Sequence, residues 1–90
     1  MSVIVNIHET LRHLTKDQSK IEVHGATVGE CLDELVMRFP RVKERLFNKK
    51  GTLLNYVDIY VNQESSYPEE LAMKVKDGDE LSIVLMVAGG

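Results

Sequence analysis

The chain has 90 residues, 43% of them hydrophobic, which predicts one compact domain over 1–90 with little room for an internal catalytic cleft. The formal net charge is −3, and we take Lys and Arg to be scattered along the chain, which argues against a nucleic-acid partner. Cys31 is the only cysteine, so an internal disulfide is excluded and a reducing compartment is favoured. No basic leader and no long apolar run is present, so we expect a cytoplasmic protein without a membrane partner.

Two strands are predicted near the start of the chain. Residues 2–7 are rich in β-branched side chains, and residues 20–24 alternate between apolar and polar. A polar segment over 15–19 lies between them. We therefore expect the two strands to pair as a hairpin.

The main helix is predicted over 28–39. Thr27 and Glu30 form a capping box, in which the Thr27 hydroxyl accepts from the Glu30 amide and the Glu30 side chain reaches back to the Thr27 amide. Apolar residues then recur at spacings of three and four until Pro40 ends the pattern. Such a helix has one apolar face, which we expect to cover a sheet.

The second half of the chain is predicted to supply the remaining strands. Apolar and polar residues alternate over 57–61, which is typical of a half-buried strand. Asp77 and Gly78 favour a tight turn, because glycine adopts positive φ without a steric penalty. The expected elements are a short helix over 41–47, a strand over 57–61, a turn over 62–66, a helical turn over 68–71, a turn over 76–79 and a strand over 80–87.

This order of elements predicts an α+β fold of the β-grasp (ubiquitin-like) type, a mixed sheet with one main helix packed on one face. The first and last strands carry apolar residues on both alternating faces, which favours central positions. A helical crossover separates them, so they are expected to run parallel as neighbours.

The chain ends in Gly89-Gly90, directly after the apolar run that forms the last predicted strand. Glycines lack a Cβ atom and can pass through a narrow channel. We expect Val87, Ala88 and Gly89 to form a flexible tail that threads into a partner. The functional group is then the α-carboxylate of Gly90, presented to a reactive centre of that partner.

The sequence resembles the ThiS/MoaD family of ubiquitin-like sulfur-carrier proteins, and within it the CysO type. The resemblance extends over nearly the whole chain, and its ending is the most specific part. The residues that carry it are Leu11-Arg12, Thr27-Val28-Gly29, Glu44-Arg45-Leu46, Ile59-Tyr60-Val61-Asn62, Asp77-Gly78-Asp79 and Val87-Ala88-Gly89-Gly90.

The resemblance implies that this chain is a carrier and not an enzyme. A ThiF/MoeB-type adenylating enzyme would use ATP to activate the Gly90 carboxylate, and sulfur would convert it to a thiocarboxylate. That sulfur would pass to an acceptor enzyme, with a cysteine synthase homologue favoured and molybdopterin, thiazole or tRNA thiolation as alternatives. The chain itself has no phosphate loop and no metal-ligand spacing, so no bound cofactor or metal is expected.

Two other functions stay open. A ubiquitin-like modifier would use the same activated carboxylate of Gly90 to form isopeptide bonds with lysines of target proteins. A non-covalent binding module would make no use of Gly90, so that deletion of this residue would be harmless.

Three further groups of residues could be interpreted as functional sites. Packing or exposure to solvent is the simpler explanation for each group. Cys31 lies on the apolar stripe of the predicted helix, where a thiol is inert. Three histidines lack metal-ligand spacing, and an acidic run resembles part of a calcium loop but fits a turn. These residues are His8, His13 and His24, and Asp77, Asp79 and Glu80.

A partner-binding patch is predicted on the outer face of the sheet. Alternation places Ile4, Tyr60, Val84 and Met86 on the face opposite the helix. Apolar and aromatic side chains on neighbouring strands are typical of interface cores. The competing interpretation is that the segment 41–54 covers this face as additional core.

Overall fold

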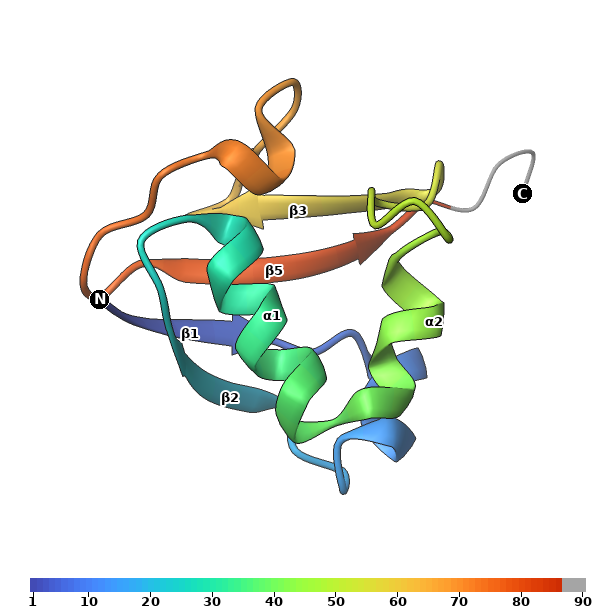
Figure 1. Ribbon diagram of the computed structural model, residues 1–90. Helices are drawn as coiled ribbons and strands as arrows, with labels where there is room; N and C mark the ends of the chain where they lie inside the picture. The colour runs from blue at the N-terminus through green and yellow to red at the C-terminus, as the bar shows by residue number, and fades with distance from the viewer. Residues whose placement is uncertain (87–90) are drawn as a thin grey trace.

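The computed structural model describes residues 1–86, which fold into a five-stranded mixed sheet with α1 across one face (Figure 1). The strand order is β2-β1-β5-β3-β4; β1 and β5 are parallel, and the other pairs are antiparallel. This confirms the predicted β-grasp arrangement with the first and last strands as neighbours. The strands are β1 (Ser2–Asn6), β2 (Lys20–His24), β3 (Val57–Val61), β4 (Glu64–Ser65) and β5 (Glu80–Leu85).

The helix α1 (Val28–Arg38) supplies most of the cover of the sheet. Its residues Val28, Cys31, Leu32 and Leu35 are fully buried, as the spacing of apolar residues predicted. They pack in one core with the inward residues of the central strands, which are Val3, Val5, Ile59, Leu81 and Ile83.

The start of α1 confirms one half of the predicted capping box and corrects the other. Thr27 accepts a hydrogen bond from the Glu30 amide at 3.1 Å. The Glu30 carboxylate, however, accepts from the Ala26 amide at 2.7 Å and not from the amide of Thr27. The Cys31 amide donates to the Thr27 carbonyl, which is the first intrahelical bond of a helix capped by Thr27.

Two connections differ from the sequence-based expectation. A 3₁₀ helix, η1 (Glu9–Leu14), lies between β1 and β2, and it buries Leu11 and Leu14 against the core. The predicted helix over 41–47 is divided into the 3₁₀ helix η2 (Pro40–Val42) and the short α2 (Lys43–Leu46). Val42 and Leu46 are fully buried, so both segments contribute to the core.

The predicted turn over 62–66 contains a short strand. β3 and β4 are joined by Asn62 and Gln63 alone, with φ of 51° and 74°. Positive φ at both central residues is the conformation of two-residue hairpin loops that matches the twist of the strands. The signal was missed because glutamine replaces the usual glycine. The predicted helical turn over 68–71 also shifts, to the 3₁₀ helix η3 (Glu70–Ala72).

The turn over 76–79 has the predicted glycine conformation, with φ of 89° at Gly78. The Asp77 carboxylate accepts from the amide of Ser2 at 2.8 Å. Asp79 is buried and accepts from the amide of Lys76 at 2.8 Å and from the side-chain amide of Asn62 at 3.0 Å. These carboxylates hold the turn and the start of β1 together, which is the structural role that the sequence favoured.

Asp79→Asn is expected to make stability less sensitive to acid. The hydrogen bond from the Asn62 side chain, with that from the Lys76 amide, lowers the pKa of Asp79 below its usual value. The folded protein therefore binds fewer protons at this site than the unfolded chain, and the stabilisation present above the unfolded pKa is lost as the pH falls through the folded pKa.

The measurement is the free energy of unfolding in urea at several pH values between neutral and strongly acidic. The wild type should be more stable than Asp79→Asn by about 1 kcal/mol at neutral pH, with the difference shrinking in acid. A difference that is constant across the whole pH range would contradict the assigned role of Asp79.

Candidate functional site

The predicted tail, Val87, Ala88, Gly89 and Gly90, lies outside the described residues. Met86 is the last residue that the structure describes, and its amide donates to the Tyr56 carbonyl at 2.6 Å. It continues β5, the middle strand of the sheet. Four residues of fully extended chain span at most about 14 Å.

The four predicted patch residues all lie on the face of the sheet opposite α1. Their neighbours Val3, Val5 and Ile83 are buried on the helix side, whereas Ile4, Tyr60 and Val84 are half-buried and Met86 is 47% exposed. Strand register nevertheless separates Ile4 from the other three. Ile4 pairs with Glu80, and Val84 lies four residues further along β5, about 13 Å away.

A polar network fills the space between Ile4 and Val84. The Asn6 side-chain amide donates to Glu80 at 3.0 Å and to the Ser82 hydroxyl at 3.2 Å. Lys20 donates to Asn6 at 2.7 Å and lies 3.7 Å from Glu80. The bond from Asn6 and the charge of Lys20 lower the pKa of Glu80. The continuous apolar patch beside the tail is therefore Tyr60, Val84 and Met86, without Ile4.

The structure adds two aromatic residues to this patch that the sequence analysis missed. Tyr56 is 47% exposed and Tyr67 is 73% exposed. Tyr56 lies opposite Met86 and four residues before Tyr60, a spacing that places both tyrosines on one face of the strand and could have identified Tyr56. Tyr67 lies in a loop and has no comparable signal. Together, Tyr56, Tyr60, Tyr67, Val84 and Met86 form what we call the tail-side patch.

A hollow of about 500 Å³ opens beside the tail-side patch, whose residues Tyr67 and Met86 line it. Leu53 and Leu54 form part of its wall together with Tyr67 and Met86. The segment 41–54 thus contributes to this face and, through Val42 and Leu46, to the core. It leaves Tyr56, Tyr67 and Met86 exposed, so it covers the face only in part.

Asp58 also lines this hollow, and its side chain is 9% exposed. One carboxylate oxygen accepts from the Ser65 hydroxyl at 2.6 Å. The other, Oδ1, has no hydrogen-bond partner among residues 1–86. Asp58 pairs in register with Val84, so a negative charge lies directly beside the centre of the tail-side patch.

The surroundings of Cys31 and of the histidines bear on the structural roles expected for them. Cys31 is fully buried, and desolvation raises the pKa of its thiol, which disfavours the nucleophilic thiolate. His8 contacts Thr10 at 2.8 Å, and His24 contacts Glu34 at 3.1 Å, whereas His13 is exposed. Over residues 1–86 the structure holds no cluster of three or more metal-ligating side chains, and no helix there is long and apolar enough to cross a membrane.

Comparison with known proteins links these features to one family. The model of the ThiS family matches residues 5–90. The sulfur carrier protein CysO of Mycobacterium tuberculosis is 36% identical over 93 residues, covering 100% of both chains. Small archaeal modifier protein 1 of Haloferax volcanii is 35% identical over 72 residues, covering 79% of each chain.

Among solved structures, the fold superposes on a chain of the Amycolatopsis orientalis BexX/CysO complex with a TM-score of 0.88. That chain is 38% identical, and the match covers 98% of this chain and 99% of that one. The fold, the sequence similarity and the family model agree, and the relatives are named as carriers or modifiers rather than enzymes. The chain belongs to the ThiS family.

Proposed function

We propose that this protein is a sulfur carrier whose C-terminal carboxylate, on Gly90, is adenylated and then converted to a thiocarboxylate. The observation that carries the proposal is the similarity to CysO sulfur carriers over the full length of both chains, together with the diglycine ending of this one. A carboxylate is a poor electrophile at neutral pH. Transfer of AMP from ATP releases pyrophosphate and gives an acyl-adenylate, from which a sulfide nucleophile displaces AMP.

The chemistry belongs to partner proteins in this proposal. A ThiF/MoeB-type enzyme holds ATP and forms the adenylate, and the chain supplies only the carboxylate and a docking surface. A sulfur-acceptor enzyme then receives the thiocarboxylate. A cysteine synthase homologue is favoured as acceptor, because the full-length relatives are of the CysO type.

Mass spectrometry of the protein isolated from cells tests this proposal. The expected result is a fraction of the intact chain heavier by the difference between sulfur and oxygen, located in the C-terminal peptide. Treatment with a thiol-alkylating reagent should label this fraction at Gly90. Absence of the heavier form under conditions that induce sulfur assimilation would contradict a carrier role.

A second candidate is a ubiquitin-like modifier, favoured by the 35% identity to small archaeal modifier protein 1. It uses the same adenylated Gly90, but a lysine amine of a target protein attacks in place of sulfur. The same mass spectrometry separates the two functions. The modifier predicts covalent adducts in which Gly90 is linked to lysine side chains.

The tail-side patch is proposed as the docking surface for the activating enzyme. Tyr60→Ala and Val84→Ser are expected to weaken association by about 1 to 3 kcal/mol each, the range for residues near the centre of an interface. We choose serine because Asp58 lies opposite Val84, and an aspartate there would place two carboxylates side by side. Affinity is measured by calorimetry or surface-immobilised binding.

Ile4→Ser is the matched control, because Ile4 lies on the same face but is separated from the patch by the polar network. It should leave the affinity unchanged. Unfolding midpoints of all three variants show whether the folded state persists. Unchanged affinity of Tyr60→Ala and Val84→Ser, at normal stability, would place the docking surface elsewhere.

A further inference from the structure

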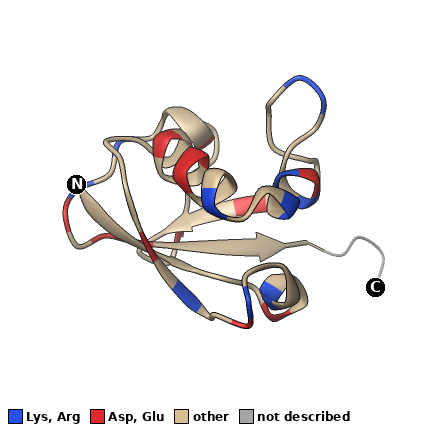
Figure 2. Ribbon diagram, turned by 60° about the horizontal axis from the view of Figure 1, so that its bottom comes forward, with Lys and Arg blue, Asp and Glu red and all other residues tan. Residues whose placement is uncertain are grey.

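Charge is distributed unevenly along the chain. Residues 38–50 contain six Lys or Arg and one acidic residue, a net charge of +5. The remaining 77 residues contain five Lys or Arg and thirteen Asp or Glu, a net charge of −8. This corrects the reading of Lys and Arg as scattered. Figure 2 shows basic segments gathered on α2 and on the loop that follows it. The protein is acidic overall but has one basic region.

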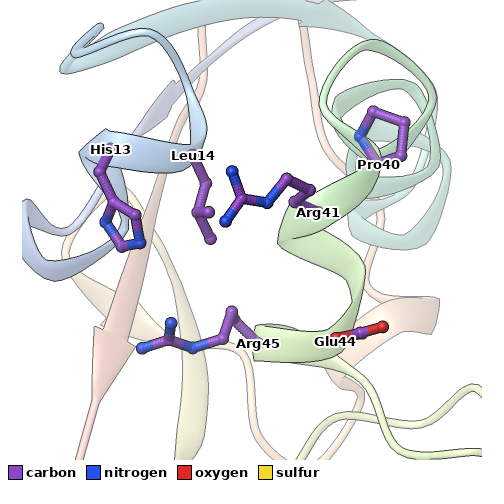
Figure 3. A pocket seen from close by; sticks show the side chains of 6 residues that line it. All are labelled: His13, Leu14, Pro40, Arg41, Glu44 and Arg45. Carbon is purple, nitrogen blue, oxygen red and sulfur yellow. The ribbon is translucent and has the colours of Figure 1, made fainter.

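Part of this basic region forms one wall of a groove. The groove lies between η1 and the η2–α2 segment, with a volume of about 490 Å³. Leu14 and Pro40 supply apolar surface, His13, Arg41 and Arg45 supply donors, and Glu44 is the one acidic residue of the lining. In Figure 3 the Arg41 side chain extends toward Leu14, and the Arg45 side chain extends toward the side of the groove where His13 lies.

Among residues 1–86, neither Arg41 nor Arg45 takes part in an ion pair. The ion pairs found there involve Lys20, His24 and Arg38. Glu44 is the one acidic residue of the segment 38–50, and Figure 3 shows its side chain directed away from Leu14 and His13. Like charges four residues apart on helical turns repel each other, so a bound anion would relieve this repulsion.

The groove lies at the end of the sheet from which the tail departs. β1 and β5 are parallel, so η1, which follows β1, lies at the same end as Met86, which follows β5. Figure 1 shows α2 at that end as well. A protein that captures the tail is therefore brought next to Arg41 and Arg45.

We propose that this groove receives an acidic segment of the protein that captures the tail; the proposal rests on the proposed carrier function. The arginine guanidinium groups can each hold a carboxylate through two parallel hydrogen bonds. Leu14 and Pro40 offer apolar contact to the stems of glutamate or aspartate side chains. The groove adds electrostatic steering to the apolar contacts of the tail-side patch.

A protein segment fits this surface better than a nucleic acid. The net charge of −8 on the rest of the chain repels a long phosphate backbone. The groove lining contains no phenylalanine, tyrosine or tryptophan on which a base could stack. Short acidic stretches of a folded partner avoid both difficulties.

The first test uses hexaglutamate peptide as the probe and follows amide chemical shifts of the isotope-labelled protein. We expect shifts confined to residues 13–14 and 41–45, lost in Arg41→Glu/Arg45→Glu and retained in the control Lys74→Glu/Lys76→Glu, which has the same charge change. Hexaglutamine should give no shifts. Shifts that persist in the arginine variant, or tighter binding of a short single-stranded DNA at these residues, would overturn the proposal.

The second test measures ATP–pyrophosphate exchange by the ThiF/MoeB-type enzyme of the same genome. Arg41→Glu/Arg45→Glu should raise KM for the carrier by about tenfold or more and leave kcat unchanged, because the tail is intact. The lysine control should behave as wild type. An unchanged KM overturns the groove proposal, whereas failure of the enzyme to activate wild type overturns the carrier function and leaves the peptide test to decide the groove.

Discussion

A C-terminal extension beyond Gly90 is expected to abolish ATP-dependent activation. In the extended chain the Gly90 carbonyl belongs to a peptide bond, so no carboxylate oxygen is available to attack the α-phosphorus of ATP. The domain should fold normally, because Met86 and all preceding elements are unchanged. The measurement is pyrophosphate exchange with the adenylating enzyme, for which we expect a rate at background level.

Proteolytic removal of the extension down to Gly90 is the control and should restore the rate. The same extension placed before Met1, which is 62% exposed, should have no effect. Gly89→Trp should also block exchange, because a large side chain cannot pass through a channel that admits glycine. Normal exchange by the uncleaved C-terminal extension would show that Gly90 is not the group activated.

The order and direction of the main strands could be predicted because each rests on local pattern and chain connectivity. Alternation identified β2 and β3, and apolar character on both faces identified β1 and β5 as central. The crossover through α1 then fixed β1 and β5 as parallel. These signals depend only on residues close in sequence and on the geometry of a helical crossover between parallel strands.

The elements that were missed depend on contacts between distant residues. η1 forms because Leu11 and Leu14 are buried in the common core, and its sequence alone has no clear helical pattern. β4 has two residues and exists only by pairing with β3. Val42 in η2 and Leu46 in α2 are likewise buried in the common core.

Part of the candidate site could likewise be predicted from the sequence, and part could not. The diglycine and the outward direction of Tyr60, Val84 and Met86 follow from sequence and alternation. Strand register decides which outward residues are neighbours, and it replaces Ile4 by tyrosines from other segments. Alternation gives the face on which each side chain lies, whereas the pairing of β1 with β5 joins segments more than 70 residues apart and has no local turn that sets its register.

Leu35→Ala is expected to cause a large loss of stability. Leu35 is fully buried at the centre of the helix face that covers the sheet. Truncating a buried leucine removes its transfer free energy and leaves a cavity, which together cost about 2 to 5 kcal/mol. The total stability of a domain of this size is roughly 5 to 13 kcal/mol, so the loss is a large fraction of it.

Urea unfolding followed by circular dichroism measures this loss as a lower midpoint with an unchanged slope. Met37→Ala is the matched control, because Met37 lies on the same helix but is 76% exposed, and its truncation should change the free energy of unfolding by less than about 0.5 kcal/mol. Under conditions where Leu35→Ala remains folded, its activation at Gly90 should equal that of wild type, since Leu35 lies on the face opposite the tail-side patch. A stability loss for Leu35→Ala no greater than that for Met37→Ala would show that α1 does not hold the sheet as the structure indicates.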